Sequence, residues 1–366
     1  MRVLLVAETD AHLKYAHSLR AALDDAGIDA RVLLLDGALL PTPEQIINAT
    51  GHRDPVDIVD APTVVDLACD GAHDWTFLLA TGPVVAFIST LIRRRGSDAR
   101  LASAVPGVAL PERAQAMRSR LFTDLFVVHS HLEVLAFGRL LTRMGLDTEV
   151  ALTTLPLIRD IGEIPLNPTV DCLFAAQPSV PGLFAERVQL LINLAGAYDT
   201  VGVKLRTVGG EGTQTHLEHY SYEEIAYALN DRGAGSFTPI EGSMIDALEL
   251  SETFATVSST AALEAIAAGR RVRIIDDFGV SPSLINYVFT GSGLLGAAAE
   301  PPTQAPDPAW MQMNYFHDPS HNDLVGMLER IEPRQWSLMP LASRSFTKAL
   351  AQGYRKATRI TGLRRG

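Results

Sequence analysis

Short runs of consecutive apolar residues alternate along the chain with longer segments in which apolar residues recur every three to four positions. Runs of this kind are typical of strands buried on both faces of a parallel sheet, and the longer segments are typical of the helices that cover it. In the first half of the chain the runs are 2–7, 30–35, 75–80 and 124–129. Repeated strand and helix units predict an open parallel sheet with helices on both faces.

The second half of the chain repeats the pattern after a break. Residues 156–170 mix proline, charged and turn-forming residues, which is typical of a domain boundary. Apolar runs then follow at 172–176, 200–206, 255–259 and 271–275. We therefore expect an α/β protein with two doubly wound, Rossmann-like domains in tandem and a basic helical tail, over residues 1–158, 171–330 and 331–366. Because such sheets bind ligands at the carboxyl ends of their strands, we expect a site in a cleft between the domains.

The composition excludes several classes of protein. The net charge of −11 argues against general nucleic-acid binding, which depends on clustered Lys and Arg. Cys69 and Cys172 provide neither a disulfide framework nor a metal-ligand cluster, which fits the reducing cytoplasm. The longest apolar stretch, 77–92, is interrupted by Thr81-Gly82-Pro83 and is too short to span a membrane. A cytoplasmic protein without a cofactor or a bound metal is expected.

The charge is unevenly distributed. After Glu332 the chain has no acidic residue and eight basic ones, so that the rest of the chain carries −19. The eight are Arg334, Arg344, Lys348, Arg355, Lys356, Arg359, Arg364 and Arg365. Two roles are open for this basic segment. It packs back onto the first domain, or it makes a peripheral contact with the anionic inner face of the membrane.

The stretch TVSSTAALEAIAAG, residues 256–269, places three hydroxyls where a strand is expected to pass into a helix. Ser258, Ser259 and Thr260 should lie at the carboxyl edge of the second sheet. Hydroxyls together with the unpaired N–H groups of a first helical turn suit a phosphate, and Glu264 is placed to accept hydrogen bonds from sugar hydroxyls. The alternative is a capping box, in which a serine only caps the helix.

A second group of polar residues lies at the end of the expected strand 200–206. Lys204 and Arg206 are two residues apart and should therefore point to one face of the sheet. A glycine-rich segment with Glu211 and His216 comes next and lacks the Gly-Lys-Ser/Thr ending of a P-loop. Two cations and a histidine suit a diphosphate that develops charge as it leaves. Ordinary surface-loop residues are the alternative.

The first domain offers candidate proton acceptors at its predicted carboxyl edge. Asp10 and His12 follow the first strand, and His129 and His131 flank the end of another. An Asp or a His in such a place can deprotonate an acceptor hydroxyl, although helix caps and buried histidines are the alternative. The sequence has no HExxH and no Gly-x-Ser-x-Gly, which excludes zinc hydrolases and α/β-hydrolases of those types.

Three stretches of the second domain make the chain resemble bacterial GT-B glycosyltransferases. They are FAAQPSVPG (174–182), KLRTVGGEGTQTH (204–216) and TVSSTAALEAIAAGRRV (256–272). The resemblance is to actinobacterial transferases of undefined acceptor and, more distantly, to enzymes that use CMP-activated sialic acid or Kdo. It implies donor binding in the second domain, with the serine pair on the donor phosphate, and acceptor binding in the first. The His-Pro pair of those families is replaced here by Leu205-Arg206.

The expected activity is metal-independent transfer of a sugar from a CMP- or UDP-linked donor to a glycan or lipid-linked acceptor, as in cell-envelope polysaccharide synthesis. The residues expected at the donor phosphate are Ser258, Ser259, Thr260, Lys204 and Arg206. Those expected at the nucleotide or sugar are Gln177, Glu211 and Glu264. Asp10 is the expected base and His216 the expected acid. Two alternatives stay open: a nucleotide-sugar epimerase of the same fold, and a non-catalytic nucleotide-sugar-binding protein.

Overall fold

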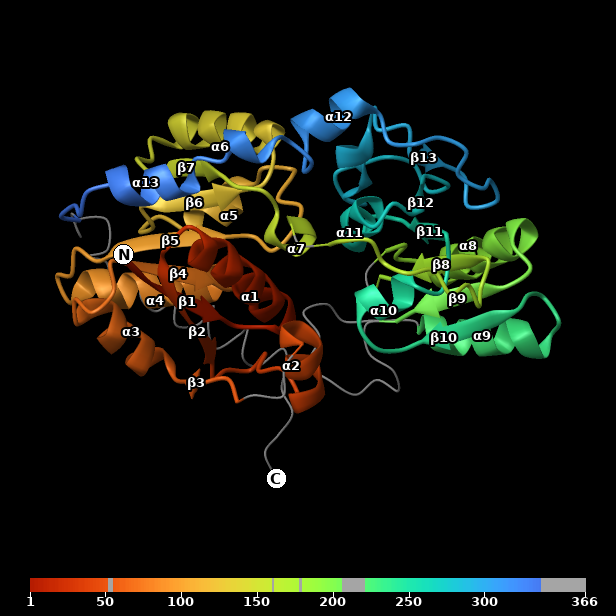
Figure 1. Cartoon of the computed structure of the whole chain (residues 1–366), viewed down its shortest axis with the longest axis horizontal. Helices are drawn as coiled ribbons and strands as arrows, with labels where there is room; N and C mark the ends of the chain where they lie inside the picture. The colour runs from red at the N-terminus through yellow and green to blue at the C-terminus, as the bar shows by residue number, and fades with distance from the viewer. Residues whose placement is uncertain (52–54, 160, 178–179, 206–220, 337–366) are drawn as a thin grey trace. The chain divides into compact units, whose positions relative to one another are not determined.

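The computed structural model describes residues 1–51, 55–159, 161–177, 180–205 and 221–336 (Figure 1). The chain divides into two compact units. Of the described residues, the first unit comprises Met1–Leu157 and Phe316–Trp336, and the second comprises Ile158–Tyr315. Each unit contains one parallel sheet, so the α/β class and the two Rossmann-like sheets expected from the hydrophobic pattern are confirmed.

The sheet of the first unit has seven strands in the order β3-β2-β1-β4-β5-β6-β7. The strands are β1 (Arg2–Ala7), β2 (Asp29–Leu35), β3 (Ile58–Val59), β4 (Trp75–Leu79), β5 (Arg100–Ala104), β6 (Leu125–Val128) and β7 (Glu149–Leu152). Every neighbouring pair in this sheet is parallel. The strand order reverses beside β1, which is the arrangement of a doubly wound sheet.

The helices of the first unit cover both faces of this sheet. They are α1 (Asp10–Asp25), α2 (Pro43–Thr50), α3 (Ala61–Cys69), α4 (Gly82–Arg94), α5 (Ala114–Arg118), α6 (His131–Met144), η2 (Pro319–His321) and α13 (Leu324–Arg330), with α7 (Pro156–Arg159) at the boundary. Leu4 and Val6 of β1 pack in one cluster with α3 and α4. Since successive side chains of a strand point to opposite faces, Val3 and Leu5 lie on the face that α1 covers.

Local signals set the ends of α6. The Ser130 side chain accepts a hydrogen bond from the N–H of Glu133, and Gly145 ends the helix with a left-handed φ of 64°. A left-handed terminal residue is nearly free of strain only for glycine, so Gly145 stops the helix at a defined place.

The sheet of the second unit has six strands in the order β10-β9-β8-β11-β12-β13. The strands are β8 (Cys172–Ala175), β9 (Val201–Lys204), β10 (Phe237–Ile240), β11 (Thr253–Thr256), β12 (Arg271–Ile275) and β13 (Leu295–Gly296). The helices are α8 (Phe184–Ala197), α9 (Tyr222–Asp231), α10 (Met244–Leu248), α11 (Ala261–Ala267), η1 (Asn286–Phe289) and α12 (Pro308–Met313). Residues of α8 and α9 share one buried cluster with Phe174 and Val203 of the sheet. These helices therefore cover one of its faces.

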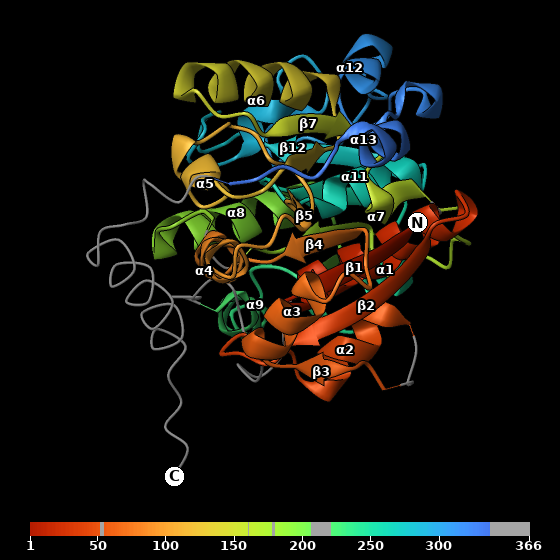
Figure 2. The same ribbon diagram turned by 90° about the vertical axis from the view of Figure 1, so that its left-hand side faces the viewer.

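After Tyr315 the chain returns to the first unit. Figure 2 shows α13 beside β7. The Asp323 carboxylate accepts a hydrogen bond from the Leu152 N–H at 2.7 Å, and the Trp75 indole donates to the Leu328 carbonyl at 3.0 Å. Residues 316–330 were expected in the second domain. They lie in the first unit because the buried side chains of α13 and the Trp75 indole have their partners there.

The first described residues of the basic segment also contact the first unit. Asp124 accepts a hydrogen bond from Arg93 at 2.8 Å and another from Arg334 at 3.0 Å. The Trp336 ring lies 4.6 Å from the Arg93 guanidinium and 4.0 Å from that of Arg334. The other seven basic residues of the segment lie outside the described residues.

None of the helices in the described ranges combines the length and the apolar character that crossing a membrane requires.

Candidate functional site

The carboxyl edge of the second sheet brings together two residues that were predicted separately. Gln177 follows β8, Ser258 follows β11, and these two strands are neighbours in the sheet. The side-chain oxygen Oε1 of Gln177 accepts the N–H of Ser258 at 2.8 Å and the Ser258 hydroxyl at 3.2 Å. Ser258 is buried and Gln177 is half-buried. The predicted phosphate and nucleotide residues thus meet at the edge where parallel sheets bind ligands.

Most backbone N–H groups of the turn around Ser258 and Ser259 already have hydrogen-bond acceptors within the protein. The Thr256 hydroxyl accepts the N–H of Ser259 at 3.3 Å, and the Ser259 hydroxyl accepts the N–H of Ala261 at 3.2 Å. The Ala262 N–H donates to the carbonyl of Ser259. The expectation of unpaired N–H groups at this turn is therefore wrong for Ser258, Ser259, Ala261 and Ala262. At these four positions the donors for a ligand must come from side chains.

The capping alternative is met only in part. Thr260 occupies the N-cap position of α11, and its side chain makes no capping hydrogen bond. Ser259, one residue earlier, supplies the oxygen that binds an N–H of the first turn. Ser258 does not cap the helix, because its hydroxyl is directed to Gln177. Its position is therefore explained by the contact with β8 and not by the helix.

Lys204 ends β9, on the other side of β8. Its register partner is Ala175, so both side chains lie on one face of the sheet. The Lys204 ammonium donates to the Leu205 carbonyl at 2.8 Å. Burial lowers the pKa of Lys204, and the carboxylates of Asp246 and Glu241 act in the opposite direction by favouring the charged form. The two further N–H groups of the ammonium can serve an anion.

The remaining donor-site residues divide into two groups. Glu264 lies in α11 and is 5% exposed. Arg206, Glu211 and His216 lie outside the described residues. Their roles stay predictions.

The carboxyl edge of the first sheet carries the predicted base. Asp10 is the first residue of α1 and is half-buried. The Thr9 hydroxyl accepts the His12 N–H at 3.3 Å and lies 2.8 Å from His12 Nδ1, so His12 takes part in the helix cap. Sequence reasoning missed Glu8, which accepts the Thr81 N–H at 2.6 Å. The signal was an acidic residue directly after an otherwise apolar strand.

Glu8 has the properties of a proton acceptor. It is 5% exposed, and desolvation by burial raises the pKa of its carboxyl group, against the hydrogen bonds with Thr81, which lower it. A carboxylate whose pKa moves toward neutrality is a stronger base than an ordinary surface carboxylate. Glu8 therefore stands beside Asp10 as a candidate base on this edge.

His129 has a structural environment. Its ring is fully buried, with Nδ1 3.2 Å from the carbonyl of Thr153 and with the Tyr15 ring 5.4 Å away between centroids. Burial lowers the pKa of His129 to about 4. The Glu133 carboxylate accepts the backbone N–H of His129 at 2.8 Å. A neutral, inaccessible imidazole is a poor candidate for the base that meets an acceptor.

His131 belongs to a cluster that only the fold reveals. Its Nε2 lies 3.2 Å from Nδ1 of His321, and its ring centroid lies 5.2 Å from that of His317. The two partners come from the segment in which the chain returns to the first unit. Burial lowers the pKa of His131, and so do the neighbouring imidazoles. In the parts of the chain that the structure describes, no group of three or more His, Cys, Asp or Glu side chains is arranged to hold a metal ion.

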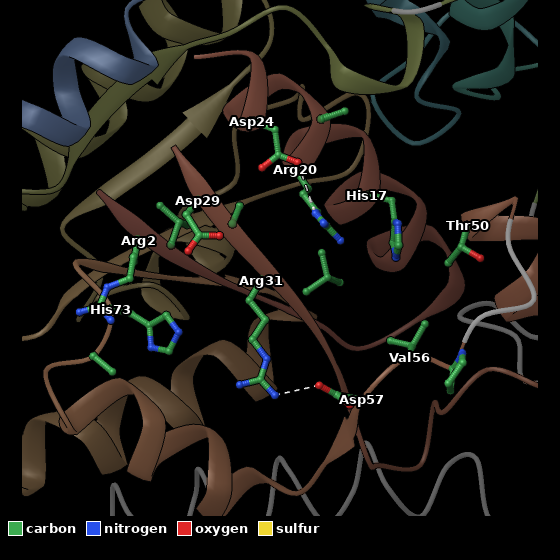
Figure 3. Close-up of a pocket in the computed structure, with 16 residues that line it drawn as sticks. Arg2, His17, Arg20, Asp24, Asp29, Arg31, Thr50, Val56, Asp57 and His73 are labelled. Carbon is green, nitrogen blue, oxygen red and sulfur yellow. Dashed lines mark hydrogen bonds and ion pairs between the residues drawn. The ribbon is translucent and has the colours of Figure 1, made fainter. Parts of the chain in front are cut away.

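A pocket of about 870 Å³ lies elsewhere in the first unit, at the amino ends of β1 and β2 (Figure 3). Its charged lining residues are Arg2, Arg20, Asp24, Asp29, Arg31 and Asp57. Arg31 pairs with Asp57 at 2.8 Å and Arg20 with Asp24 at 3.4 Å. This balanced lining favours neither anions nor cations, and the pocket lies at the opposite ends of the strands from the predicted base.

Solved structures with a similar fold include two UDP-GlcNAc 2-epimerases and a complex with UDP and glucose. UDP-GlcNAc 2-epimerase from Neisseria meningitidis bound to UDP-GlcNAc is 12% identical, with a TM-score of 0.53, and the match covers 97% of this chain and 100% of that one. The epimerase from Methanocaldococcus jannaschii is 10% identical, with a TM-score of 0.54 and coverage of 96% and 99%. HepE from Anabaena, in complex with UDP and glucose, is 15% identical, with a TM-score of 0.53 and coverage of 99% and 95%. At these identities the likeness shows the fold, which is of the GT-B type.

No curated protein matches this chain. A family model does match it, over residues 3–331. Because that match spans most of the sequence, the chain belongs to the family described as "Putative glycosyltransferase (DUF6716)".

Proposed function

We propose that this protein transfers a sugar from a nucleotide-linked donor to a glycan or lipid-linked acceptor, with the donor bound by the second unit. The observation that carries the proposal is the contact of Gln177 with Ser258 at the carboxyl edge of the second sheet, in a chain of a glycosyltransferase family. Parallel sheets of this kind bind nucleotides at that edge. UDP is the first nucleotide to test, because the similar structures from Neisseria and Anabaena contain UDP or UDP-GlcNAc.

The donor phosphate is assigned to the hydroxyls of Ser259 and Thr260, the Ser258–Gln177 pair and the Lys204 ammonium. Arg206 and His216, assigned from the sequence, complete this set. When the bond between the sugar and the phosphate breaks, the phosphate gains negative charge. Lys204 and Arg206 stabilise that charge, and His216 donates a proton to it. Cationic side chains in this role replace the divalent ion of many other nucleotide-using sites, so the transfer is metal-independent.

The acceptor belongs to the first unit in this proposal. A carboxylate there removes the proton from the acceptor hydroxyl, and the hydroxyl oxygen forms the new bond to the sugar. Asp10 is the base expected from the sequence, and the buried Glu8 is the second candidate for this role. Single Asp10→Asn and Glu8→Gln variants separate the two, because the variant of the true base loses turnover while donor affinity is retained.

An epimerase is the second candidate function. The observation that favours it is the similarity of the fold to UDP-GlcNAc 2-epimerases from two organisms over nearly the whole chain. Product analysis separates the functions. A transferase releases the nucleotide and needs an acceptor, apart from slow hydrolysis, whereas an epimerase changes the sugar without any acceptor. A non-catalytic binding protein does neither.

The test begins with thermal stabilisation by UDP-, CMP- and GDP-linked sugars and by the free nucleotides. A ligand at 100 times its dissociation constant adds about 2.7 kcal/mol to the free energy of unfolding. Donors that stabilise the protein are then followed for hydrolysis and transfer, with and without EDTA. Stabilisation by none of them contradicts donor binding. Loss of turnover in EDTA that magnesium or manganese restores contradicts the metal-independent mechanism.

A further inference from the structure

The orientation of the Gln177 side-chain amide is determined by Ser258. A backbone N–H can only donate, so the atom of Gln177 that faces the Ser258 N–H at 2.8 Å must be the acceptor Oε1. The Ser258 hydroxyl, at 3.2 Å from the same oxygen, agrees with this assignment. Consequently the NH₂ group, Nε2, points away from Ser258. Within the described residues Nε2 has no hydrogen-bond partner.

The backbone beside Gln177 is held by a buried cation and a tyrosine. Gln177 forms an isolated antiparallel bridge with Val180. The Val180 carbonyl accepts the Tyr222 hydroxyl at 3.4 Å, and the Pro181 carbonyl accepts Nε of Arg187 at 3.0 Å. Arg187 is 1% exposed, and its guanidinium lies 4.8 Å from the centre of the Tyr222 ring. Val180, the bridge partner of Gln177, is thus anchored in the core, and the Gln177 side chain can be positioned before any ligand arrives.

The Ser258 hydroxyl has a single proton, which it donates in a hydrogen bond to the Gln177 side-chain oxygen. While that hydrogen bond exists, Ser258 cannot also donate to a phosphate oxygen. The Gln177 NH₂ group offers two donors and no acceptor, which suits the acceptor-rich oxygens of a phosphate. The donor function expected of Ser258 is therefore transferred to the neighbouring amide.

We infer that Gln177 is the residue that contacts a phosphate oxygen of the nucleotide donor through Nε2, and that Ser258 is a positioning residue that fixes the amide. This inference rests on the proposed function, because the phosphate is that of the nucleotide-sugar donor. It changes the assignment of the two residues. Ser258 acts on the donor through Gln177.

The main variant is Gln177→Glu, with UDP as the probe and isothermal titration calorimetry as the measurement. A glutamate keeps the shape of the side chain and still accepts both hydrogen bonds from Ser258, while it replaces the NH₂ donors by a negatively charged oxygen. Loss of a hydrogen bond to a charged group should weaken UDP binding about tenfold or more. The matched control is Gln189→Glu on α8, where Gln189 is exposed and donates to Asn193. This control adds the same charge and should leave the UDP affinity unchanged.

A double-variant cycle tests the positioning role of Ser258. Ser258→Ala should weaken UDP binding in the parent protein and Ser258→Thr, which keeps the hydroxyl, should restore much of the affinity. In a Gln177→Ala background, Ser258→Ala should have little further effect, because it acts through the missing amide. Additive losses would instead mean that Ser258 contacts the donor itself, which overturns the positioning role.

The outcomes separate the inference from the proposed function. If the parent protein binds UDP and Gln177→Glu binds it equally well while the unfolding midpoint is unchanged, the role of Gln177 is overturned and the proposed function stands. If the parent protein binds neither UDP nor any other nucleotide or nucleotide sugar of the panel, the proposed function fails and the inference with it. Should Gln177→Glu fold poorly, the cycle of Ser258→Ala with Gln177→Ala gives the decision, since only a loss that disappears in the Gln177→Ala background supports the amide.

Discussion

Arg93 and Asp124 form an ion pair inside the first unit, with Nη2 of the arginine 2.8 Å from Oδ2 of the aspartate and with side-chain exposures of 0% and 4%. Arg93 lies in α4, and Asp124 directly precedes β6. Arg93 also donates to the carbonyls of Ala99 and Phe122. Arg334, from the far end of the described chain, binds the second oxygen of the same carboxylate. The pair therefore links a helix, a strand and the returning segment.

Replacing Asp124 by alanine should destabilise the protein strongly. The substitution leaves the buried Arg93 without its counter-charge, and breaking a buried pair in this way costs about 3 to 5 kcal/mol. Denaturant unfolding measures the change. The matched control is Asp57→Ala, which removes the carboxylate of an exposed pair with Arg31 and should change the free energy of unfolding by at most about 1 kcal/mol. Equal effects of the two substitutions would contradict the structural role of the buried pair.

The stability of the protein should fall as the pH is lowered through the range in which His129 titrates. Burial lowers the pKa of His129 to about 4 in the folded state, whereas an unfolded histidine titrates near about 6.5. Between these values the unfolded state binds more protons, so stability rises with pH. The contribution is present above the unfolded pKa and is lost as the pH falls toward the folded one. It amounts to about 3 kcal/mol at most.

Thermal unfolding from pH 8 to pH 4.5 tests this prediction. Because carboxylates also titrate at the acid end, the comparison that matters is between the parent and a His129→Gln variant. The variant should show a shallower loss of stability between pH 6.5 and pH 5. Parallel curves for the two proteins would mean that His129 takes no part in the pH dependence.

Replacing Ser258 and Ser259 together by alanine should reduce donor affinity by about two orders of magnitude, since it removes the Ser259 hydroxyl from the proposed phosphate site and the Ser258 hydroxyl that binds the Gln177 amide oxygen. A purely structural role predicts a different result. The loss of the Ser259 cap on the Ala261 N–H should then lower stability by about 0.5 to 2 kcal/mol and leave donor affinity nearly unchanged. Calorimetric titration with the donor and denaturant unfolding without it, on the same variant, measure both quantities. Earlier unfolding with full donor affinity would show that the site is misplaced.

Trp336 should stabilise the first unit. Its ring lies beside Arg93, Arg334 and Phe122, with a centroid distance of 5.7 Å to the Phe122 ring. Trp336→Ala removes these contacts and should lower the free energy of unfolding by about 1 to 3 kcal/mol. Denaturant unfolding of the full chain measures this change in the free energy of unfolding. Trp310→Ala, which removes a tryptophan of the second unit, is the comparison variant. An unchanged unfolding midpoint for Trp336→Ala would show that Trp336 does not stabilise the first unit.

The membrane alternative for the basic segment has its own test. If its arginines and lysines bind an anionic surface, vesicle binding should increase with the content of anionic lipid and decrease with salt. The matched comparison is a chain that ends after Trp336, which keeps the contacts with Asp124 and lacks seven of the eight basic residues. Equal binding of both chains to neutral and anionic vesicles would rule the contact out.

Local features of the sequence were enough to predict most elements that form the two sheets. The apolar run at 2–7 is β1 and that at 271–275 is β12, and the local residues Ser130 and Gly145 bound α6. These features depend on residues within a few positions of one another. Burial of an apolar run, a side-chain cap and a left-handed glycine each have their physical cause in the local chain. The resemblance to GT-B transferases, carried by three motifs of the second domain, agreed with the family match.

The partners of the site residues depended on the tertiary structure. Gln177 and Ser258 are 81 positions apart and meet because β8 and β11 are neighbours in the sheet. His131 meets His321 because the chain returns to the first unit after Tyr315. Hydrophobic periodicity shows which residues are buried and does not show the order of the strands, on which these contacts depend. The sequence by itself therefore determined most of the strands and the hydroxyls of the Ser258 turn, while only the packing of distant strands decided that the Ser258 hydroxyl binds a glutamine.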